Sequence, residues 1–308
     1  MQDDAAGRHL VIEEISHAGY RCLRLARGGL AVTVTVDVGP RVIAFTSDGG
    51  PSPFALTPDL TIDRPGLATF RMHGGHRLWC APEVPEMTYL PDDRPVEVRS
   101  GPEGATFGSF EPRTGIRKEL RISIGDAGVV VDHVLRNQGA SPVRHAPWAI
   151  TMLTLGGEAW IPQSQDPLDP GGFQGNRSIV LWPYSLLTDE RLVVGDRLLR
   201  VRAPEGVPGR FKLGTQANPG WLAYRLGAQL FVKRARHLPG SEYVDLGASA
   251  QCYVGDRFIE VETLGPIVTL QPGGSTEHRE TWSLHTVGAD ADPEATIAGL
   301  GLPAQGRN

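Results

Sequence analysis

Cysteine is scarce in this sequence. Only three of the 308 residues are cysteines, Cys22, Cys80 and Cys252, and no two of them have a C-x-x-C spacing. An odd number without that spacing argues against a disulfide framework and against a zinc site built on thiolates. We expect the three side chains to be reduced and mostly packed as small apolar groups. Cys80, beside Trp79 in a histidine-rich segment, is the one candidate for a reactive thiol.

Long apolar runs and basic clusters are missing as well. No stretch reaches the roughly 20 apolar residues of a membrane span, and the N-terminus lacks the basic and apolar parts of a signal peptide. The formal net charge of −5, without a Lys/Arg block, argues against nucleic acid and anionic membranes as partners. These absences predict a cytoplasmic protein that binds neither.

The familiar cofactor and hydrolase motifs do not occur. The chain has no G-x-G-x-x-G after a strand, no P-loop, no G-x-S-x-G and no H-E-x-x-H. Nucleotide-cofactor and serine-hydrolase functions are therefore disfavoured, and we expect no cofactor.

Glycine and proline, in contrast, are abundant and interrupt the chain about every ten residues. The 38 Gly and 25 Pro favour many short strands joined by turns over long helices. Alternation supports this: Val32, Val34 and Val36 point one way while Thr33 and Thr35 point the other. We find no amphipathic crossover helices, so the sheets should be antiparallel and packed face to face. The fold class is all-β, a large antiparallel β-sandwich formed by a single domain over residues 1–308.

The individual strands can be placed by the same alternation. We expect strands at 9–16, 20–26, 30–38, 40–46, 96–100, 105–111, 116–124, 129–136, 143–155, 179–182, 197–202, 221–226, 228–234, 250–255, 258–264 and 277–285. Segments 83–95 and 161–177, rich in Pro, Asp, Gly and Gln, should be loops. One helix is expected near the end, capped by Asp292 with Pro293 in its first turn.

The densest polar segment covers residues 71–83. It places His73, His76, Arg77, Trp79 and Glu83 around a flexible Gly pair. Sugar sites need donors and acceptors for hydroxyl groups and a flat apolar face for the C–H side of the ring. This mixture supplies all three and predicts a carbohydrate site, with a solvated surface loop as the alternative.

A metal site is the other interpretation of these histidines. His73 and His76 could join Glu83 or His145 as ligands. A His-Gly-Gly-His segment in a loop does not fix ligand geometry as a helical zinc motif does. We therefore expect no metal.

Two pairs of charged residues could extend such a site. Alternation puts Glu260 and Glu262 together on one face of a strand, where each would raise the proton affinity of the other if solvent were limited. A solvated strand face is the alternative. Lys212 and Lys233 could share a polar face with them, and if they converged with Arg77 they would favour a carboxylated sugar or a phosphosugar.

The order of three features resembles the galactose mutarotase-like superfamily, which includes the aldose 1-epimerases. These are Met72-His73-Gly74-Gly75, a middle strand after an Asn turn, and Val261-Glu262-Thr263 followed by a Pro-Gly turn. The resemblance implies the supersandwich fold, a small-molecule carbohydrate as ligand, a sugar-binding role for His73 and the role of base for Glu262. It spans about residues 30–285.

The sequence departs from this pattern at one catalytic position. Trp148 stands where the resemblance would place the acid histidine. Either His145 or His76 has taken over that role, or the protein no longer performs mutarotation. A lyase or hydrolase acting on a modified sugar could use Lys212 or Arg77 to stabilise negative charge. A non-catalytic module could bind sugar through Trp79, Arg77 and Lys233.

Overall fold

Two large antiparallel sheets pack face to face in the computed structural model, which describes residues 9–303 apart from positions 127, 217 and 289. Alternation in the sequence produces this arrangement. Along β10 (Ile116–Gly125), Leu120 and Ile122 are buried against the opposite sheet, while Glu119 and Arg121 form ion pairs on the outer face. The antiparallel all-β sandwich expected from the sequence is confirmed.

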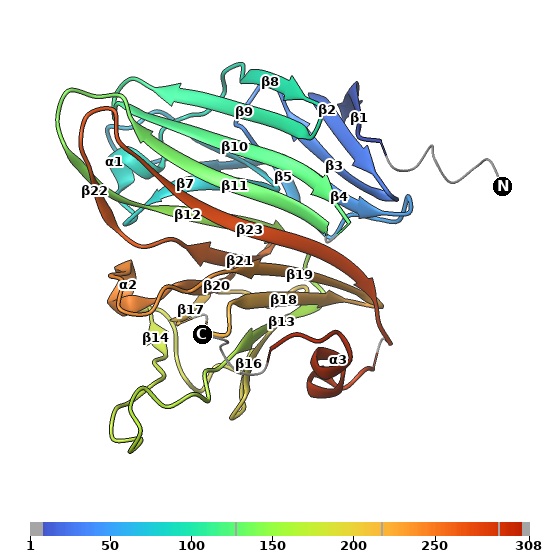
Figure 1. Ribbon diagram of the computed structural model, residues 1–308, viewed down its shortest axis with the longest axis vertical. Coiled ribbons are helices and arrows are strands. Elements are labelled where there is room, and N and C mark those ends of the chain that lie inside the picture. Colours follow the sequence, from blue (N-terminus) through green and yellow to red (C-terminus); the bar gives the residue numbers. More distant parts are fainter. Residues whose placement is uncertain (1–8, 127, 217, 289, 304–308) are drawn as a thin grey trace.

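One sheet has 11 strands. Its strands in spatial order are β1 (Val11–His17), β2 (Tyr20–Arg27), β3 (Leu30–Thr35), β4 (Val42–Ser47), β7 (His76–Ala81), β12 (Val143–Leu153), β21 (Ile259–Leu264), β20 (Ala250–Val254), β17 (Phe211–Thr215) and β14 (Val180–Leu181), and β22 (Val268–Leu270) pairs with β12. Central strands β7, β12 and β21 are distant in sequence, so this sheet gathers residues from three parts of the chain (Figure 1).

The other sheet has 10 strands. In spatial order they are β15 (Leu192–Val194), β16 (Leu198–Ala203), β13 (Gly157–Pro162), β18 (Trp221–Leu226), β19 (Gln229–Ala235), β23 (Ser275–Thr286), β11 (Gly128–Asn137), β10, β9 (Gly104–Glu111) and β8 (Glu97–Gly101). A separate hairpin consists of β5 (Leu56–Ile62) and β6 (Phe70–Gly74). The helices are short: α1 (Pro85–Thr88), α2 (Val244–Gly247) and α3 (Pro293–Gly299).

The central strand β12 has two buried faces. Leu153 belongs to the main core between the sheets, whereas Trp148, Ile150 and Met152 belong to a second apolar cluster on the other side. Because side chains alternate along a strand, residues of even number on β12 face away from the sandwich interior. That outer face of the 11-stranded sheet carries the site described below.

The Gly pair at 74–75 was expected to be a flexible part of a polar segment, and that expectation was wrong. Gly74 ends β6 and Gly75 leads into β7, and both have positive φ, 100° and 69°. A Cβ on Gly74 would lie 2.3 Å from the Ala55 carbonyl oxygen, and one on Gly75 would lie 2.3 Å from that of Val42. Glycine is required here because other backbones approach it closely.

The other local predictions can be compared directly. The Asp292 side chain caps α3 by accepting from the Ala295 N–H at 2.8 Å, as the sequence indicated. Segment 163–177 contains no described strand or helix, whereas segment 83–95, expected as a loop, includes the short helix α1. No helix in the described part of the chain is long and apolar enough to cross a membrane.

Candidate functional site

A cavity of about 590 Å³ opens on the outer face of the 11-stranded sheet. We call it the cleft. Its aromatic lining consists of Trp79, Tyr89, Trp148, Trp182, Tyr184, Tyr253 and Phe258. Its charged lining consists of Arg64, Arg77, Glu83, Arg210, Lys212, Asp256, Arg257 and Glu260.

Glu262 lies directly beneath the cleft floor, with a side chain that is 0% exposed. Its Oε2 accepts from Trp148 Nε1 at 2.7 Å and from Lys212 Nζ at 3.1 Å. No described residue donates to its other oxygen, Oε1. Burial raises the pKa of this carboxyl, and the Lys212 charge offsets only part of that effect. The result is a carboxylate held in place on one side, with unused acceptor capacity on the other.

Lys212 is the cation that separates Glu262 from the cleft. Its Nζ lies 4.9 Å from the centre of the Trp148 ring and 4.7 Å from that of Trp182. Two aromatic faces and one carboxylate therefore hold the ammonium group in a fixed position.

A second ion pair lies on the cleft surface. Arg77 Nη2 lies 2.9 Å from Glu260 Oε1, and the guanidinium carbon is 4.0 Å from the centre of the Trp79 ring. Both Arg77 and Glu260 are more than nine-tenths buried. No described residue accepts from Arg77 Nε or Nη1. The predicted neighbours Arg77, Trp79 and Glu260 thus share one wall.

Glu83 completes the set of predicted residues in the cleft. It accepts a short hydrogen bond from the Tyr89 hydroxyl. Burial, reinforced by Glu83, raises the pKa of Tyr89, so the phenol stays protonated. The Arg64 guanidinium lies 4.3 Å from the centre of the Tyr89 ring.

His73, expected to bind sugar, does not line the cleft. Its Nδ1 is 2.8 Å from the Tyr20 hydroxyl and its Nε2 is 2.7 Å from Asp93 Oδ1. Burial and the charge of Arg41 lower the pKa of His73. Asp92 completes a group with metal-ligand spacing, but its carboxylate is already paired with Arg41 at 2.8 Å.

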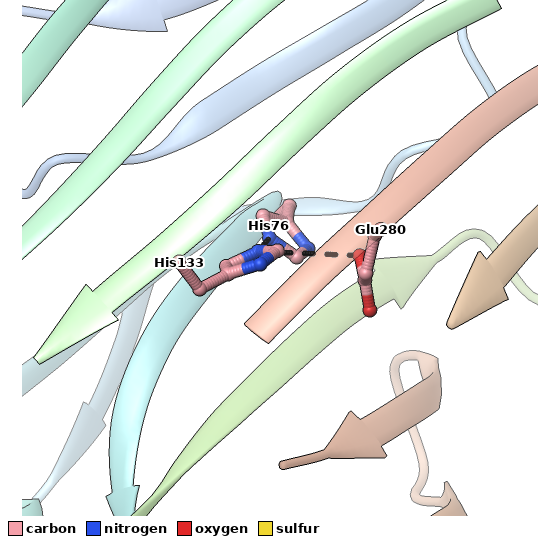
Figure 2. Close-up of side chains that lie close together, drawn as sticks. All are labelled: His76, His133 and Glu280. Carbon is pink, nitrogen blue, oxygen red and sulfur yellow. Dashed lines mark hydrogen bonds and ion pairs between the residues drawn. The ribbon is translucent and has the colours of Figure 1, made fainter. Parts of the chain in front are cut away.

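His76 and Lys233 also lie outside the cleft, on the opposite side of the sheet from Glu262. They belong to a group of buried side chains between the two sheets, which we call the inter-sheet cluster and which consists of His76, His133, Lys233, His278 and Glu280. Figure 2 shows how His76 on β7 and His133 on β11 meet beside Glu280 on β23. Alternation explains the separation from Arg77, because neighbours on β7 point to opposite faces.

The hydrogen bonds of this cluster have a definite direction. The His278 carbonyl can only accept, so His133 Nδ1 donates to it at 2.9 Å. Burial lowers the pKa of His133, so the neutral ring must accept at Nε2 from His76 Nε2 at 2.6 Å. His76 Nδ1 then accepts from the Thr151 hydroxyl at 2.9 Å, which accepts from Lys233 Nζ at 3.1 Å. Burial also lowers the pKa of His76, and it lowers that of His278 to about 3, so these rings are neutral as well.

His76, His133 and Glu280 could in principle hold a metal ion, since one ligand atom of each lies within 4.8 Å of the others. Lys233 Nζ, however, lies 2.7 Å from Glu280 Oε1 in the same buried space. A metal ion would have to break the 2.6 Å hydrogen bond between the two histidine ring nitrogens. It would also add a second buried positive charge beside that of Lys233. These residues fit a metal poorly, and we infer that the inter-sheet cluster stabilises the packing of the two sheets against each other.

His145, the other predicted acid, is also away from the cleft. It sits near the start of β12, and burial lowers its pKa. Its Nδ1 has no hydrogen-bond partner among the described residues. None of the described residues that line the cleft is a histidine.

Among the lining residues that were not identified from the sequence are Trp182, Tyr184, Arg210 and Tyr253. Trp182 and Tyr184 follow β14, after the long loop, and Arg210 immediately precedes β17. Their aromatic and basic character was visible, but no local spacing connects them with Glu262. Only the pairing of β14, β17, β20 and β21 brings them together.

Comparison with known proteins rests on structure. No protein-family model matches the sequence, and no curated protein matches it. A TPR-domain containing protein from Parabacteroides distasonis ATCC 8503 has a similar structure, with a TM-score of 0.59 and 15% identity over 89% of this chain and 48% of that one. The chain thus spans about half the length of that protein.

Two further solved structures match over nearly their whole length. A candidate mutarotase, YeaD, from Salmonella typhimurium has a TM-score of 0.58 and 10% identity, over 90% of this chain and 94% of that one. A galactose mutarotase-like protein from Lactobacillus casei ATCC 334 has a TM-score of 0.52 and 10% identity, over 89% of this chain and 100% of that one. Identities this low establish the fold alone. The chain therefore has the fold of the galactose mutarotase-like proteins.

Proposed function

We propose that the cleft binds a small carbohydrate and that Glu262 acts as a general base at its anomeric centre. The lining supports the binding step. Trp79, Trp148 and Trp182 provide an aromatic lining for the C–H side of a sugar ring, with Trp182 the most accessible of the three, and Arg77 and Glu260 offer a donor and an acceptor for hydroxyl groups. The fold shared with mutarotase-like structures agrees with this ligand class.

The arrangement of Glu262 carries the catalytic part of the proposal. Trp148 and Lys212 orient one carboxylate oxygen, while the other has no described donor. Burial raises the pKa of the carboxyl toward the range in which a base works best near neutral pH. Perturbed carboxyls beside a cavity are characteristic of functional sites.

The proposed reaction opens and recloses the sugar ring. Glu262 removes the proton of the anomeric hydroxyl, the electron pair forms a C1 carbonyl, and the bond from C1 to the ring oxygen breaks. Lys212 gives a proton to the ring oxygen, taking the acid role that a histidine was expected to fill. Rotation about C1–C2 and reversal of these steps return both protons and yield the other anomer. The anomeric and ring oxygens share one carbon, so adjacent groups such as Glu262 and Lys212 can serve both.

Non-catalytic carbohydrate binding is the second candidate. It is favoured by the full burial of Glu262 behind Lys212, because a base must come within hydrogen-bonding reach of its substrate. In this case the Glu262–Lys212 pair would only hold Trp148 and Trp182 in position.

One experiment separates the two candidates. Ligand-detected NMR with common aldoses, uronic acids and sugar phosphates would report binding, and exchange between anomers would be followed in the same samples. Accelerated exchange supports catalysis, and binding without it supports the second candidate. Failure of every sugar to bind would contradict both. New unsaturated or cleaved products would point instead to the lyase or hydrolase alternative.

A further inference from the structure

One corner of the cleft contains a cation that the proposed reaction does not use. Arg210 immediately precedes β17, two residues before Lys212, and both side chains line the cavity. The Arg210 guanidinium carbon lies 4.6 Å from the centre of the Tyr184 ring. Lys212 is bonded to Glu262 at 3.1 Å, whereas no described residue forms a hydrogen bond or ion pair with Arg210. The guanidinium is thus oriented by a ring while its N–H groups remain available.

Two phenol groups occupy the same corner. Tyr184 and Tyr253 line the cavity, and neither hydroxyl has a hydrogen-bond partner among the residues that the structure describes. Burial raises the pKa of both, that of Tyr253 to about 12, although the Arg210 charge partly opposes this. Both hydroxyls are therefore protonated at neutral pH and can donate. Three potential donors from separate parts of the chain therefore line one cavity.

Several carboxylates raise the pKa values of Tyr184 and Tyr253, among them Glu83 and Glu262, and two that line the cleft, Asp256 and Glu260, have partners of their own. Asp256 Oδ1 accepts from the Gly209 N–H at 2.8 Å, and Glu260 is paired with Arg77 at 2.9 Å. Neither forms an ion pair with Arg210 in the structure. The Arg210 charge consequently lacks a direct counter-charge from the protein.

We propose that the carbohydrate bound in the cleft carries an oxyanion substituent, a carboxylate or a phosphate, recognised by Arg210 together with the hydroxyls of Tyr184 and Tyr253; this inference rests on the proposed function. A planar guanidinium matches either group through paired N–H donors, and hydrogen bonds to an ionised acceptor are stronger than neutral ones. The sugar ring would lie over the tryptophans, with its charged substituent toward this corner.

Arg257 provides a matched control. It also lines the cleft, but its Nη2 is 2.8 Å from Asp59 Oδ1, so its guanidinium is already engaged. Replacing Arg257 removes the same charge from the cleft rim as replacing Arg210. If the preference for a charged sugar came only from the positive electrostatic potential of the cleft, both replacements would reduce it. If Arg210 binds the oxyanion directly, mainly its replacement would reduce the preference.

The test measures affinity for matched sugars. Isothermal titration of the full chain would compare glucose with glucuronate and glucose 6-phosphate, and galactose with its corresponding acid and phosphate. We expect either the uronates or the sugar phosphates to bind roughly tenfold or more tightly than the neutral sugars. A gain of this size corresponds to one hydrogen bond to an ionised group. The uronate and phosphate series show which oxyanion is recognised.

The variants complete the test. Arg210→Gln should reduce this preference, taken as the ratio of affinities for the charged and the neutral sugar within each variant, to within about twofold, and Arg257→Gln should keep most of it. If neutral sugars bind and neither charged series binds more tightly, the oxyanion inference is overturned and the proposed function is unaffected. An equal loss in both variants also overturns it. If no sugar of any kind binds, the proposed function itself fails.

Discussion

Trp148 donates its indole N–H to Glu262 Oε2 at 2.7 Å across the β12–β21 strand pair. The residue that stands where the family resemblance would place an acid histidine is thus a direct hydrogen-bond partner of the proposed base. A tryptophan indole cannot act as a proton-donating acid in this reaction, but it does stabilise the ionised carboxylate. In the proposed reaction, Trp148 would therefore orient Glu262 and would not transfer a proton.

Replacing Trp148 with Phe tests that relationship. Phe keeps an aromatic face but removes the N–H, so the ionised form of Glu262 loses a hydrogen bond and its pKa rises further. Because the base works when ionised, the acidic limb of the exchange rate should move to higher pH, with roughly tenfold slower exchange at neutral pH. An unchanged pH profile would show that this hydrogen bond does not tune the base.

Trp182 should contribute to sugar binding although it is remote in sequence from the other lining residues. Trp182→Ala removes one of the two rings beside Lys212, and we expect sugar affinity to fall roughly three- to tenfold in a titration. Phe173→Ala is the control, because that ring is 93% exposed, lies in the preceding loop and does not line the cleft. Equal effects of the two changes would contradict a stacking role for Trp182.

The inter-sheet cluster should control stability rather than binding. Lys233→Met leaves Glu280 buried without its cation and should lower the free energy of unfolding by about 3–5 kcal/mol. Lys233→Met combined with Glu280→Gln should recover part of that loss, because no charge then remains unpaired. Arg279→Met, which breaks an exposed pair with Asp132, should cost about 1 kcal/mol or less. Urea unfolding measures all three, and equal costs for the two single changes would contradict the assignment.

Acid should destabilise the fold in the window where free histidine titrates. His278, with its pKa lowered from 6.5 to about 3, stays neutral when folded but takes up a proton when unfolded below pH 6.5. Stability is therefore lost as pH falls below 6.5, at about 1.4 kcal/mol per pH unit for each such histidine. His76 and His133 act in the same direction. Glu262 has the opposite effect on stability, because its raised pKa lets the folded state take up a proton at a higher pH than the unfolded state. It contributes only one proton, against several from the histidines.

Urea unfolding at pH 7 and pH 5.5 measures the net effect of the histidines and Glu262 on the free energy of unfolding. We expect a clearly lower free energy of unfolding at pH 5.5. A value that stays constant or increases would mean that the histidines of the inter-sheet cluster are not held neutral.

The fold could be predicted from the sequence because its signals are local. Gly and Pro mark the turns, and alternation marks the strands. On β21 the same alternation put Glu260 and Glu262 on one face and Val261 on the other, and the structure agrees: Val261 lies in the core between the sheets.

The separation of Arg77 from His76 could not be predicted in the same way. Every residue of β7 is buried, and polar side chains lie on both of its faces, so apolar and polar residues do not alternate. The sequence of this segment therefore shows no strand pattern and indicates only a polar group around two glycines. In the structure its odd-numbered residues Arg77 and Trp79 face the cleft, while His76 faces the inter-sheet cluster.

The cleft corner with Arg210 and Tyr253 illustrates a different limit. These residues meet only because β17 and β20 are adjacent in the sheet. Pairing between strands distant in sequence depends on the packing of the whole core, and no short spacing records it. The same holds for Lys233, whose place in the core depends on Glu280 from another strand.

The most direct measurement compares anomer exchange by NMR in the wild type, in Glu262→Gln and in Glu260→Gln, with sugar binding followed in the same samples. Gln keeps the shape of the side chain but cannot take up the proton. We predict that Glu262→Gln binds sugar yet loses the accelerated exchange, whereas Glu260→Gln, whose carboxylate is paired with Arg77, weakens binding more than exchange. Exchange that persists unchanged in Glu262→Gln would contradict the assignment of this carboxylate as the base.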